Sequence, residues 1–324
     1  MDLFSFLQLD DFSTELLSLI SHIVDVSVDI SQVLSTGVNP CNDEVGESNV
    51  HGDVKKSMDV YAHKRFFEIM PKCDALLGIA SEESELPIFK LSPTPNSKYL
   101  LAVDPLDGSS NLDMNISVGT IFSIFVNDDH EKISADIFLK PGSSQLVSGY
   151  FIYGPMTQLV LTWGNGSHIF TLDRFHRVYH LHKRSITIPN MTSEFAINLS
   201  NLRFWSPPVQ KYVNRCLEGD AGPRKRHFNM RWVASMVADV HRLLMRGGVF
   251  LYPSDSREKT KFGRLRLLYE VSPISWIVEQ AGGLTTDGYV SSLLDVVPLS
   301  LHQRVSTILG SSEEVLYIKS IFNE

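Results

Sequence analysis

The chain has 324 residues, of which 43% are apolar and 20% are charged, and its formal net charge is -8 at pH 7. This length is enough for one large domain or two ordinary ones, each with a buried core. The net negative charge argues against a surface that binds nucleic acid or anionic lipid, which would need Lys and Arg clustered to face phosphates, so neither partner is expected.

The cysteines and the amino-terminal segment favour a cytoplasmic protein. Cys41, Cys73 and Cys216 are the only cysteines, and none are paired at metal-ligand spacing, so neither a disulfide framework nor a zinc ribbon is indicated. Residues 1–30 are apolar but interrupted by acidic side chains, and they show neither a basic start nor a cleavage site. We therefore expect an amphipathic helix here, neither a signal peptide nor a membrane span.

The first half of the chain predicts two helices followed by strands. Apolar residues recur at helical intervals over residues 14–34, and a second helix is expected over 55–70 after a polar loop at 37–52. A short strand over 75–80 ends in SEES, and another over 99–103 leads into VDPLDGSSN. Further short β-branched or aromatic runs, divided by turn residues, predict strands as far as His182.

The pattern changes near residue 190, where we place a boundary between a domain of residues 1–190 and one of residues 191–324. Beyond it helices and strands alternate. The segment NMRWVASMVADVHRLLMRGGVFLYP predicts a helix, a stop at Gly247 and Gly248, and a strand. SPISWIVEQAGGLTT repeats the same scheme. Periodicity alone supports a mixed α/β protein.

Acidic residues gather at the ends of these predicted elements. They are Asp53 and Asp59, Glu82 and Glu83, Asp104 and Asp107, and Glu270. Carboxylates are the ligands that Mg²⁺ prefers, and phosphate chemistry commonly uses two or more such ions. Taken singly, each residue is as well explained as a solvated loop residue.

Gly108, Ser109 and Ser110 add a second ingredient directly after Asp107. Glycine permits close backbone approach, and amides at a turn or helix start form a concave anion site. The signal is weak alone. Combined with DPLD and the preceding SEE, it favours a phosphate site next to a metal site.

With these residues identified, the chain resembles class I fructose-1,6-bisphosphatase, a member of the lithium-sensitive sugar and inositol phosphatase superfamily. The resemblance runs from Thr14 to the end and is carried by GDVKKSMDV, SEE, VDPLDGSSNLDMNISVGTIFSIF, SGYFIYGPMTQLVLT, FNMRWVASMVADVHRLLMRGGVFLYP, GRLRLLYEVSPISWIVEQAGG, LDVVPLSLHQRV and ILGS. SHIFTLDRFHRVYHL looks most like the α-proteobacterial branch.

The resemblance implies a layered α-β-α-β-α sandwich of two domains that assembles as a homotetramer. It implies a site with two or more Mg²⁺ ions per subunit, or Mn²⁺ in their place. The implied metal ligands are Glu82, Asp104, the carbonyl of Leu106, Asp107 and Glu270. Glu83, with Asp59 behind it, would activate the attacking water, and Asp53 would complete the site.

The resemblance also implies how a sugar bisphosphate is held. Asp107, Gly108, Ser109, Ser110 and Arg266 would bind the phosphate that is removed, and Met236 would contact the sugar. The second phosphate would be bound by Asn198, Tyr252 and Arg264, and by Arg231 from a neighbouring subunit. Without the resemblance, Asn198 and Tyr252 are better explained as buried hydrogen-bonding residues of the core, and Met236 is equally well explained as an ordinary core residue.

Several positions depart from the family pattern. Trp232 stands where animal relatives have a phosphate-binding tyrosine and would serve as an aromatic donor to the substrate with a different reach. Arg264 replaces a common lysine. The loop SDSREKTKFG is longer than in those relatives, so its basic residues receive no role. Val126 stands where AMP-inhibited relatives have an arginine, and the turn before the first helix also differs. We therefore predict weak or absent AMP inhibition, although Lys98 and Tyr99 match the remaining pattern.

The expected activity is hydrolysis of the 1-phosphate of fructose 1,6-bisphosphate. Sedoheptulose 1,7-bisphosphate is an alternative or additional substrate. An inositol-monophosphatase-like enzyme and a non-catalytic sugar-phosphate-binding homologue remain as rivals, but every expected acidic ligand is present, which favours the enzyme. His241 lies among apolar residues and is interpreted as structural rather than catalytic.

Overall fold

The computed structural model describes residues 1–37, 57–127 and 133–324. The helices are α1 (Leu3–Leu7), α2 (Thr14–Thr36), α3 (Ser57–Ile69), α4 (Pro207–Leu217), α5 (Met236–Arg246), α6 (Ser272–Gln280) and α7 (Ser312–Phe322). The strands are β1 (Leu76–Ser81), β2 (Ile88–Phe89), β3 (Tyr99–Asp107), β4 (Val118–Val126), β5 (Val147–Tyr153), β6 (Thr157–Thr162), β7 (Ser167–Asp173), β8 (Val178–Ile186), β9 (Glu194–Ala196), β10 (Asn229–Met230), β11 (Val249–Tyr252), β12 (Leu265–Arg266), β13 (Leu284–Thr286), β14 (Arg304–Val305) and β15 (Thr307–Gly310).

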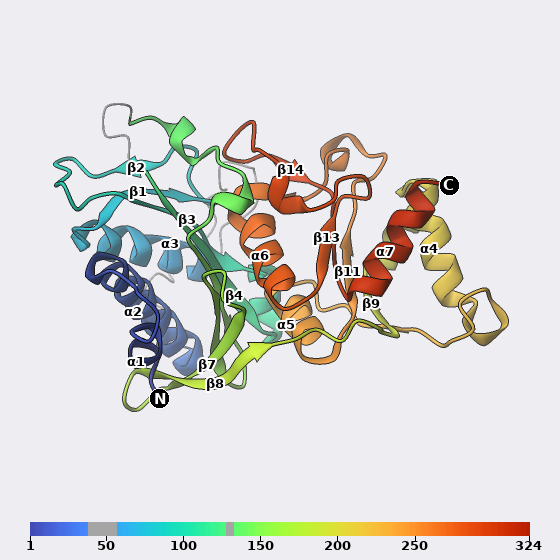
Figure 1. Ribbon diagram of the computed structural model, residues 1–324, viewed down its shortest axis with the longest axis horizontal. Helices are drawn as coiled ribbons and strands as arrows, with labels where there is room; N and C mark the ends of the chain where they lie inside the picture. Colours follow the sequence, from blue (N-terminus) through green and yellow to red (C-terminus); the bar gives the residue numbers. More distant parts are fainter. Residues whose placement is uncertain (38–56, 128–132) are drawn as a thin grey trace.

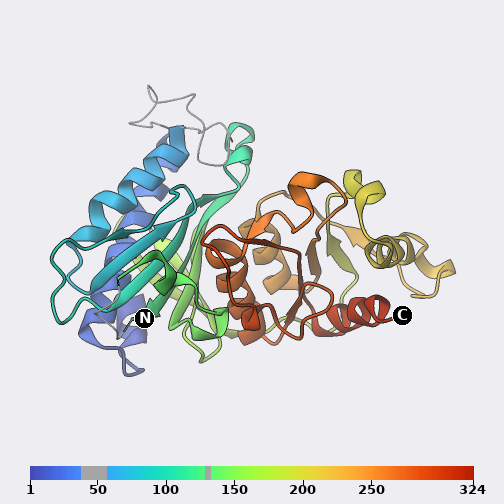
Figure 2. The same cartoon turned by 90° about the horizontal axis from the view of Figure 1, so that it is seen from above.

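The elements form five layers, which confirms the predicted α-β-α-β-α sandwich (Figure 1). Helices α1, α2 and α3 cover one face of an eight-stranded sheet ordered β2-β1-β3-β4-β5-β6-β7-β8. Helices α5 and α6 pack between that sheet and a five-stranded sheet ordered β10-β9-β11-β15-β13, and α4 and α7 lie on the outer side. Figure 2 shows the amino terminus in the half built on the larger sheet and the carboxyl terminus at the far end of the other half.

The central strands β3, β4 and β5 of the larger sheet are buried on both faces because they carry apolar residues at consecutive positions. In β4, Phe122 packs in the cluster under α2 and α3, whereas Ile121 packs in the cluster of α5 and α6. Phe151 and Tyr150 divide between the two clusters in the same way on β5. Successive side chains of a strand point to opposite faces, so one strand contributes to two cores.

Helix α2 confirms the predicted amino-terminal helix. The Ser13 hydroxyl accepts a hydrogen bond from the Leu16 amide at 3.2 Å, and the helix ends at Gly37 in the left-handed conformation. In the described part of the chain it is the one helix long and apolar enough to cross a bilayer, and 56% of its most apolar window is buried. A core helix passes the same test, and α2 packs on the sheet and on α3.

The other predicted elements are confirmed with shifted ends. The second helix is α3, and the helix, Gly-Gly stop and strand pattern appears twice, as α5 with β11 and as α6 with β13. β3 runs further than predicted and includes Asp104 and Asp107. The predicted loop over 37–52 lies, after Gly37, outside the described residues. The boundary near residue 190 falls between β8 and β9 and stays a prediction.

Candidate active site

The register of two neighbouring strands places acidic side chains at one edge of the larger sheet. β1 and β3 are parallel, with Ser81 opposite Val103, so Glu82, directly after β1, lies beside Asp104 of β3. The Glu82 amide donates a hydrogen bond to the Val103 carbonyl at 3.0 Å and continues the pairing. SEE and VDPLD are about twenty residues apart in the sequence, but the parallel pairing of their strands brings their carboxylates together.

Asp107 lies beyond an irregularity in the pairing of β3 with β4, which comes between Asp104 and Asp107. Its carboxylate accepts hydrogen bonds from the Ser235 hydroxyl at 2.9 Å and from the Val237 amide at 3.0 Å, at the start of α5. Gly108 follows with φ +76°, and a Cβ there would lie 2.6 Å from the Ser235 Cβ. Glycine is therefore required where the two halves of the chain meet.

Glu270 comes from the carboxyl-terminal half. It sits in a π-helical turn, Leu267–Val271, that leads into α6. Its Oε2 accepts a hydrogen bond from the Arg266 amide at 2.6 Å. Single π-helical turns are frequent at functional sites. Here the turn places the Glu270 side chain beside Asp104 and Asp107.

Asp104, Asp107 and Glu270 converge, with one carboxylate oxygen of each lying within 4.8 Å of the others. All three side chains are buried. Glu82 is adjacent but pairs with the Arg266 guanidinium, which also lies 3.9 Å from Glu270. The structure thus brings together three of the four carboxylates predicted as metal ligands and places the fourth beside them.

Burial and mutual repulsion disfavour negative charge in this group. Burial raises the pKa of Asp104 well above its usual value, and Glu82, Asp107 and Glu270 add to the shift. Burial raises the pKa of Glu82 as well, against the opposing effect of Arg266. The pKa of Glu270 is raised to about 7, again chiefly by burial. Such a cluster stays ionised only if positive charge joins it.

The donor set suits a divalent cation. Buried carboxylates are hard oxygen ligands, and bound cations are often the largest local charges in such sites. The Oε2 atom of Glu83 is buried and has no hydrogen-bond partner among the described residues. Clustered acids with raised pKa values and an unsatisfied carboxylate oxygen beside them therefore fit a metal centre of the type predicted.

A cavity of about 570 Å³ opens over this group. Its lining contains most of the predicted site residues: Asp59, Glu82, Glu83, Asp104, Leu106, Asp107, Gly108, Ser109, Ser110, Tyr252, Arg264, Arg266 and Glu270. Asp53 lies outside the described residues. Residues from five separated parts of the sequence thus meet in one concave space, large enough for a small phosphorylated ligand.

Four predicted substrate residues do not line this cavity. Asn198 caps the turn Leu199–Phe204 and accepts a hydrogen bond from the Ser200 amide at 3.2 Å. Trp232 stacks on Phe250 and contacts the ring of Tyr252, with ring centroids 5.9 and 5.5 Å away. Met236 is buried in the core, and Arg231 is exposed. Trp232 therefore packs against the Tyr252 ring without itself lining the cavity.

The cavity also contains residues to which the sequence analysis assigned no role, including Lys259, Thr260 and Arg304. Arg304 pairs with Arg266 across β12 and β14, and its charge lowers the pKa of Glu270 after the larger effects of Arg266. In the sequence, only the place of Arg304 in LHQRV, a stretch that resembles the family, pointed to a role at this site. Lys259 lies in the loop SDSREKTKFG. Because this loop is longer than in relatives, the sequence could not place Lys259 relative to the site.

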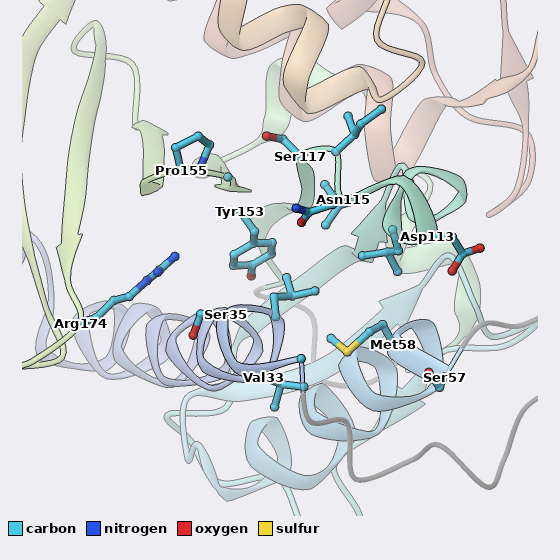
Figure 3. A pocket seen from close by; sticks show the side chains of 16 residues that line it. Val33, Ser35, Ser57, Met58, Asp113, Asn115, Ser117, Tyr153, Pro155 and Arg174 are labelled. Carbon is cyan, nitrogen blue, oxygen red and sulfur yellow. The ribbon is translucent and has the colours of Figure 1, made fainter.

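His241 does not line the active-site cavity, which agrees with its interpretation as a structural residue. Its Nδ1 lies 2.9 Å from the Tyr150 hydroxyl, and burial lowers its pKa to about 4. A separate cavity of about 690 Å³ lies near the end of α2. Figure 3 shows Arg174 and Asp113 on opposite sides of it, with Tyr153 between. None of the predicted site residues that the structure describes lines this second cavity.

Comparisons with known proteins agree with this geometry. Two family models match, "Fructose-1-6-bisphosphatase, N-terminal domain" over residues 7–184 and "Fructose-1-6-bisphosphatase, C-terminal domain" over residues 188–323. A fructose-1,6-bisphosphatase class 1 from Methylacidiphilum infernorum (isolate V4) is 50% identical over 277 residues, which are 85% of this chain and 78% of that protein. The crystal structure of the Leishmania major fructose-1,6-bisphosphatase in holo form is similar, with a TM-score of 0.93 at 30% identity, covering 100% of this chain and 99% of that chain.

Proposed function

The chain belongs to the class 1 fructose-1,6-bisphosphatases and hydrolyses fructose 1,6-bisphosphate, and we propose that water attacks the 1-phosphate in the cavity over Asp104, Asp107 and Glu270. The observation that carries this proposal is the convergence of these three buried carboxylates within 4.8 Å beside the Gly108 turn. Hydrolysis then yields fructose 6-phosphate and phosphate.

Enzymes of this family are metal-dependent, and we propose Mg²⁺ as the ion, with Mn²⁺ as a substitute. Glu82, Asp104, the carbonyl of Leu106, Asp107 and Glu270 would hold it. When bound, divalent cations neutralise phosphoryl charge and orient the attacking and leaving oxygens. Glu82 now pairs with Arg266. If Glu82 held a cation instead, Arg266 would be free to bind the departing phosphate.

The chain's own groups bind the phosphate and move the proton. The turn at Gly108, Ser109 and Ser110 offers amides and hydroxyls to the phosphoryl oxygens. Glu83 accepts the proton of the attacking water, a role suited to its Oε2, which has no hydrogen-bond partner among the described residues. Asp59, buried in the first turn of α3, lines the same cavity and supports Glu83.

The second phosphate would lie near Tyr252 and Arg264, whose guanidinium is 6.0 Å from the Tyr252 ring centroid. Asn198, Met236 and Trp232 are proposed as further contacts on the substrate, and Trp232 also packs against the ring of Tyr252. Arg231 directly follows β10, is exposed and does not line the cavity of its own subunit. This supports the proposal that it reaches a neighbouring subunit's site in a homotetramer.

The remaining proposals concern the location, the branch, the domain boundary and the regulation of the enzyme. We propose a cytoplasmic enzyme of the α-proteobacterial branch, with its domains divided near residue 190. We also propose weak or absent AMP inhibition. Val126 pairs with Tyr99 across the sheet, and the Tyr99 hydroxyl lies 3.1 Å from that of Ser13, the cap of α2. That contact occupies a tyrosine which AMP-inhibited relatives retain for the nucleotide.

The proposal is tested by phosphate release from fructose 1,6-bisphosphate with Mg²⁺ and with a chelator. We expect turnover that the chelator abolishes and that Mg²⁺ restores. Sedoheptulose 1,7-bisphosphate, a monophosphate and AMP are measured in parallel. Folded protein that shows no metal-dependent turnover would support a non-catalytic sugar-phosphate-binding protein instead.

A further inference from the structure

The loop between β11 and β12 carries an unusual number of basic residues. They are Arg257, Lys259 and Lys261, with Arg264 at its end. The loop borders the active-site cavity through Lys259, Thr260 and Arg264. Which of these cations can receive a ligand depends on which are already neutralised within the protein.

Asp255 fixes the conformation of this loop. Its side chain is 3% exposed and forms an ion pair with the Arg257 guanidinium. It accepts hydrogen bonds from the Arg257 amide at 3.0 Å and from the Thr260 hydroxyl. The hydrogen bonds from Arg257 hold the pKa of Asp255 well below its usual value. Asp255 is therefore ionised at neutral pH, and its hydrogen bonds hold the turn together.

The backbone anchors the same loop at further points. The Thr260 amide donates to the Arg257 carbonyl at 3.0 Å, and the Gly263 amide donates to the Thr260 carbonyl at 3.0 Å. The Ser256 amide donates to the Phe204 carbonyl at 2.9 Å, while the Arg257 guanidinium lies 4.5 Å from the Phe204 ring centroid. The loop is thus a folded turn attached to the body of the protein.

The four cations divide into two pairs. Arg257 is neutralised by Asp255, and Lys261 lies 2.5 Å from a Glu258 oxygen. Lys259 and Arg264 form no ion pair with any described residue, and both line the cavity beside Tyr252. Two uncompensated cations at the edge of a concave site favour an anion between them, and a phosphate dianion matches that charge.

We infer that Lys259 is a specificity-determining residue that binds, together with Arg264, the substrate phosphate that is not removed. This inference rests on the proposed function and deepens it. The Thr260 hydroxyl is engaged by Asp255, so it holds the turn and leaves the Lys259 ammonium as the group that the loop contributes. The extended loop is then a phosphate-binding element of this chain.

Lys259→Gln and Lys261→Gln form a matched pair, because both remove one positive charge from the same exposed loop. With Mg²⁺ at saturation, we expect Lys259→Gln to raise KM for fructose 1,6-bisphosphate about tenfold and to leave kcat within about twofold, since a charged hydrogen bond to the bound substrate is lost. KM for fructose 1-phosphate stays unchanged. Lys261→Gln leaves all these values within about twofold of the wild type, and Lys259→Arg restores most of the lost affinity.

A second readout uses fructose 6-phosphate as a competitive inhibitor. Its inhibition constant rises about tenfold in Lys259→Gln and is unchanged in Lys261→Gln. Equal KM values for the two glutamine variants, or an equal effect of Lys259→Gln on the bisphosphate and on fructose 1-phosphate, overturn the inference. Failure of the proposed function looks different, because the wild type would then show no metal-dependent turnover at all. Unchanged melting temperatures show that both variants are folded.

Discussion

The active-site cavity has two parts that are built by opposite means. The acidic part, Asp104, Asp107 and Glu270, is buried, and its geometry is set by strand register and by the starts of α5 and α6. The cationic part, Arg264 and Lys259, is exposed and belongs to a loop held by the Asp255 turn. Changes in the first part therefore affect both chemistry and folding, whereas changes in the second affect affinity alone.

Asp104→Asn gives the largest expected effect. It removes one carboxylate of the converging group while preserving its shape, and we expect kcat to fall by about 10³-fold because the charge that organises the reacting phosphate is lost. Asp113→Asn, an exposed change outside this cavity, is the control and leaves kcat unchanged. Comparable activity in the two variants would mean that the acidic part is not where the chemistry occurs.

Arg264→Ala tests the cationic part. We expect KM for fructose 1,6-bisphosphate to rise about tenfold with little change in kcat, because a phosphate contact made equally in ground and transition states is removed. KM for a monophosphate changes much less. Steady-state kinetics on both substrates measure the difference. If both KM values rise equally, Arg264 does not recognise the second phosphate.

The acidic part also carries a cost in stability. Repulsion among buried carboxylates disfavours the folded state without metal, so Asp104→Asn should raise the free energy of unfolding in a chelator by about 1 kcal/mol. Mg²⁺ should raise the melting temperature of the wild type and have little effect on Asp104→Asn. Thermal unfolding in chelator and in Mg²⁺ measures both. A wild type that Mg²⁺ does not stabilise contradicts this prediction.

The smallest expected effect is on the pH dependence of stability and comes from His241, which lies outside both parts of the cavity. Burial lowers its pKa from 6.5 to about 4, so the folded state keeps it neutral while the unfolded chain takes up a proton below pH 6.5. The unfolded state then binds more protons, and stability falls as the pH drops from 6.5 towards 4. Replacement His241→Gln should flatten this slope, whereas the exposed change His180→Gln should not. Equal slopes in the two variants would exclude His241 as the cause.

The sequence predicted the acidic part better than the cationic part for a physical reason. Asp104 and Asp107 follow an apolar run and precede a glycine turn, so local pattern locates them, and parallel pairing brings Glu82 alongside. The π-helical turn that aims Glu270 and the pairing of Glu82 with Arg266 have no local signature, since both depend on packing between the halves of the chain.

Loop SDSREKTKFG shows the limit most clearly. Its composition indicates only a charged turn, and four basic residues in and beside it appear equivalent in the sequence. Tertiary structure divides them, because Asp255 and Glu258 neutralise Arg257 and Lys261 and leave Lys259 at the cavity. The five-layer architecture, in contrast, followed from resemblance, since periodicity alone supported only a mixed α/β protein.

The most direct test of the central claim is Mn²⁺ binding, followed by the loss of the free-ion paramagnetic signal, in the wild type, Glu83→Gln and Asp104→Asn. The wild type and Glu83→Gln should bind Mn²⁺ alike, although Glu83→Gln loses turnover, whereas Asp104→Asn should bind Mn²⁺ much more weakly. If Asp104→Asn takes up Mn²⁺ as the wild type does, these carboxylates are not the metal site, and the account of the acidic part is wrong.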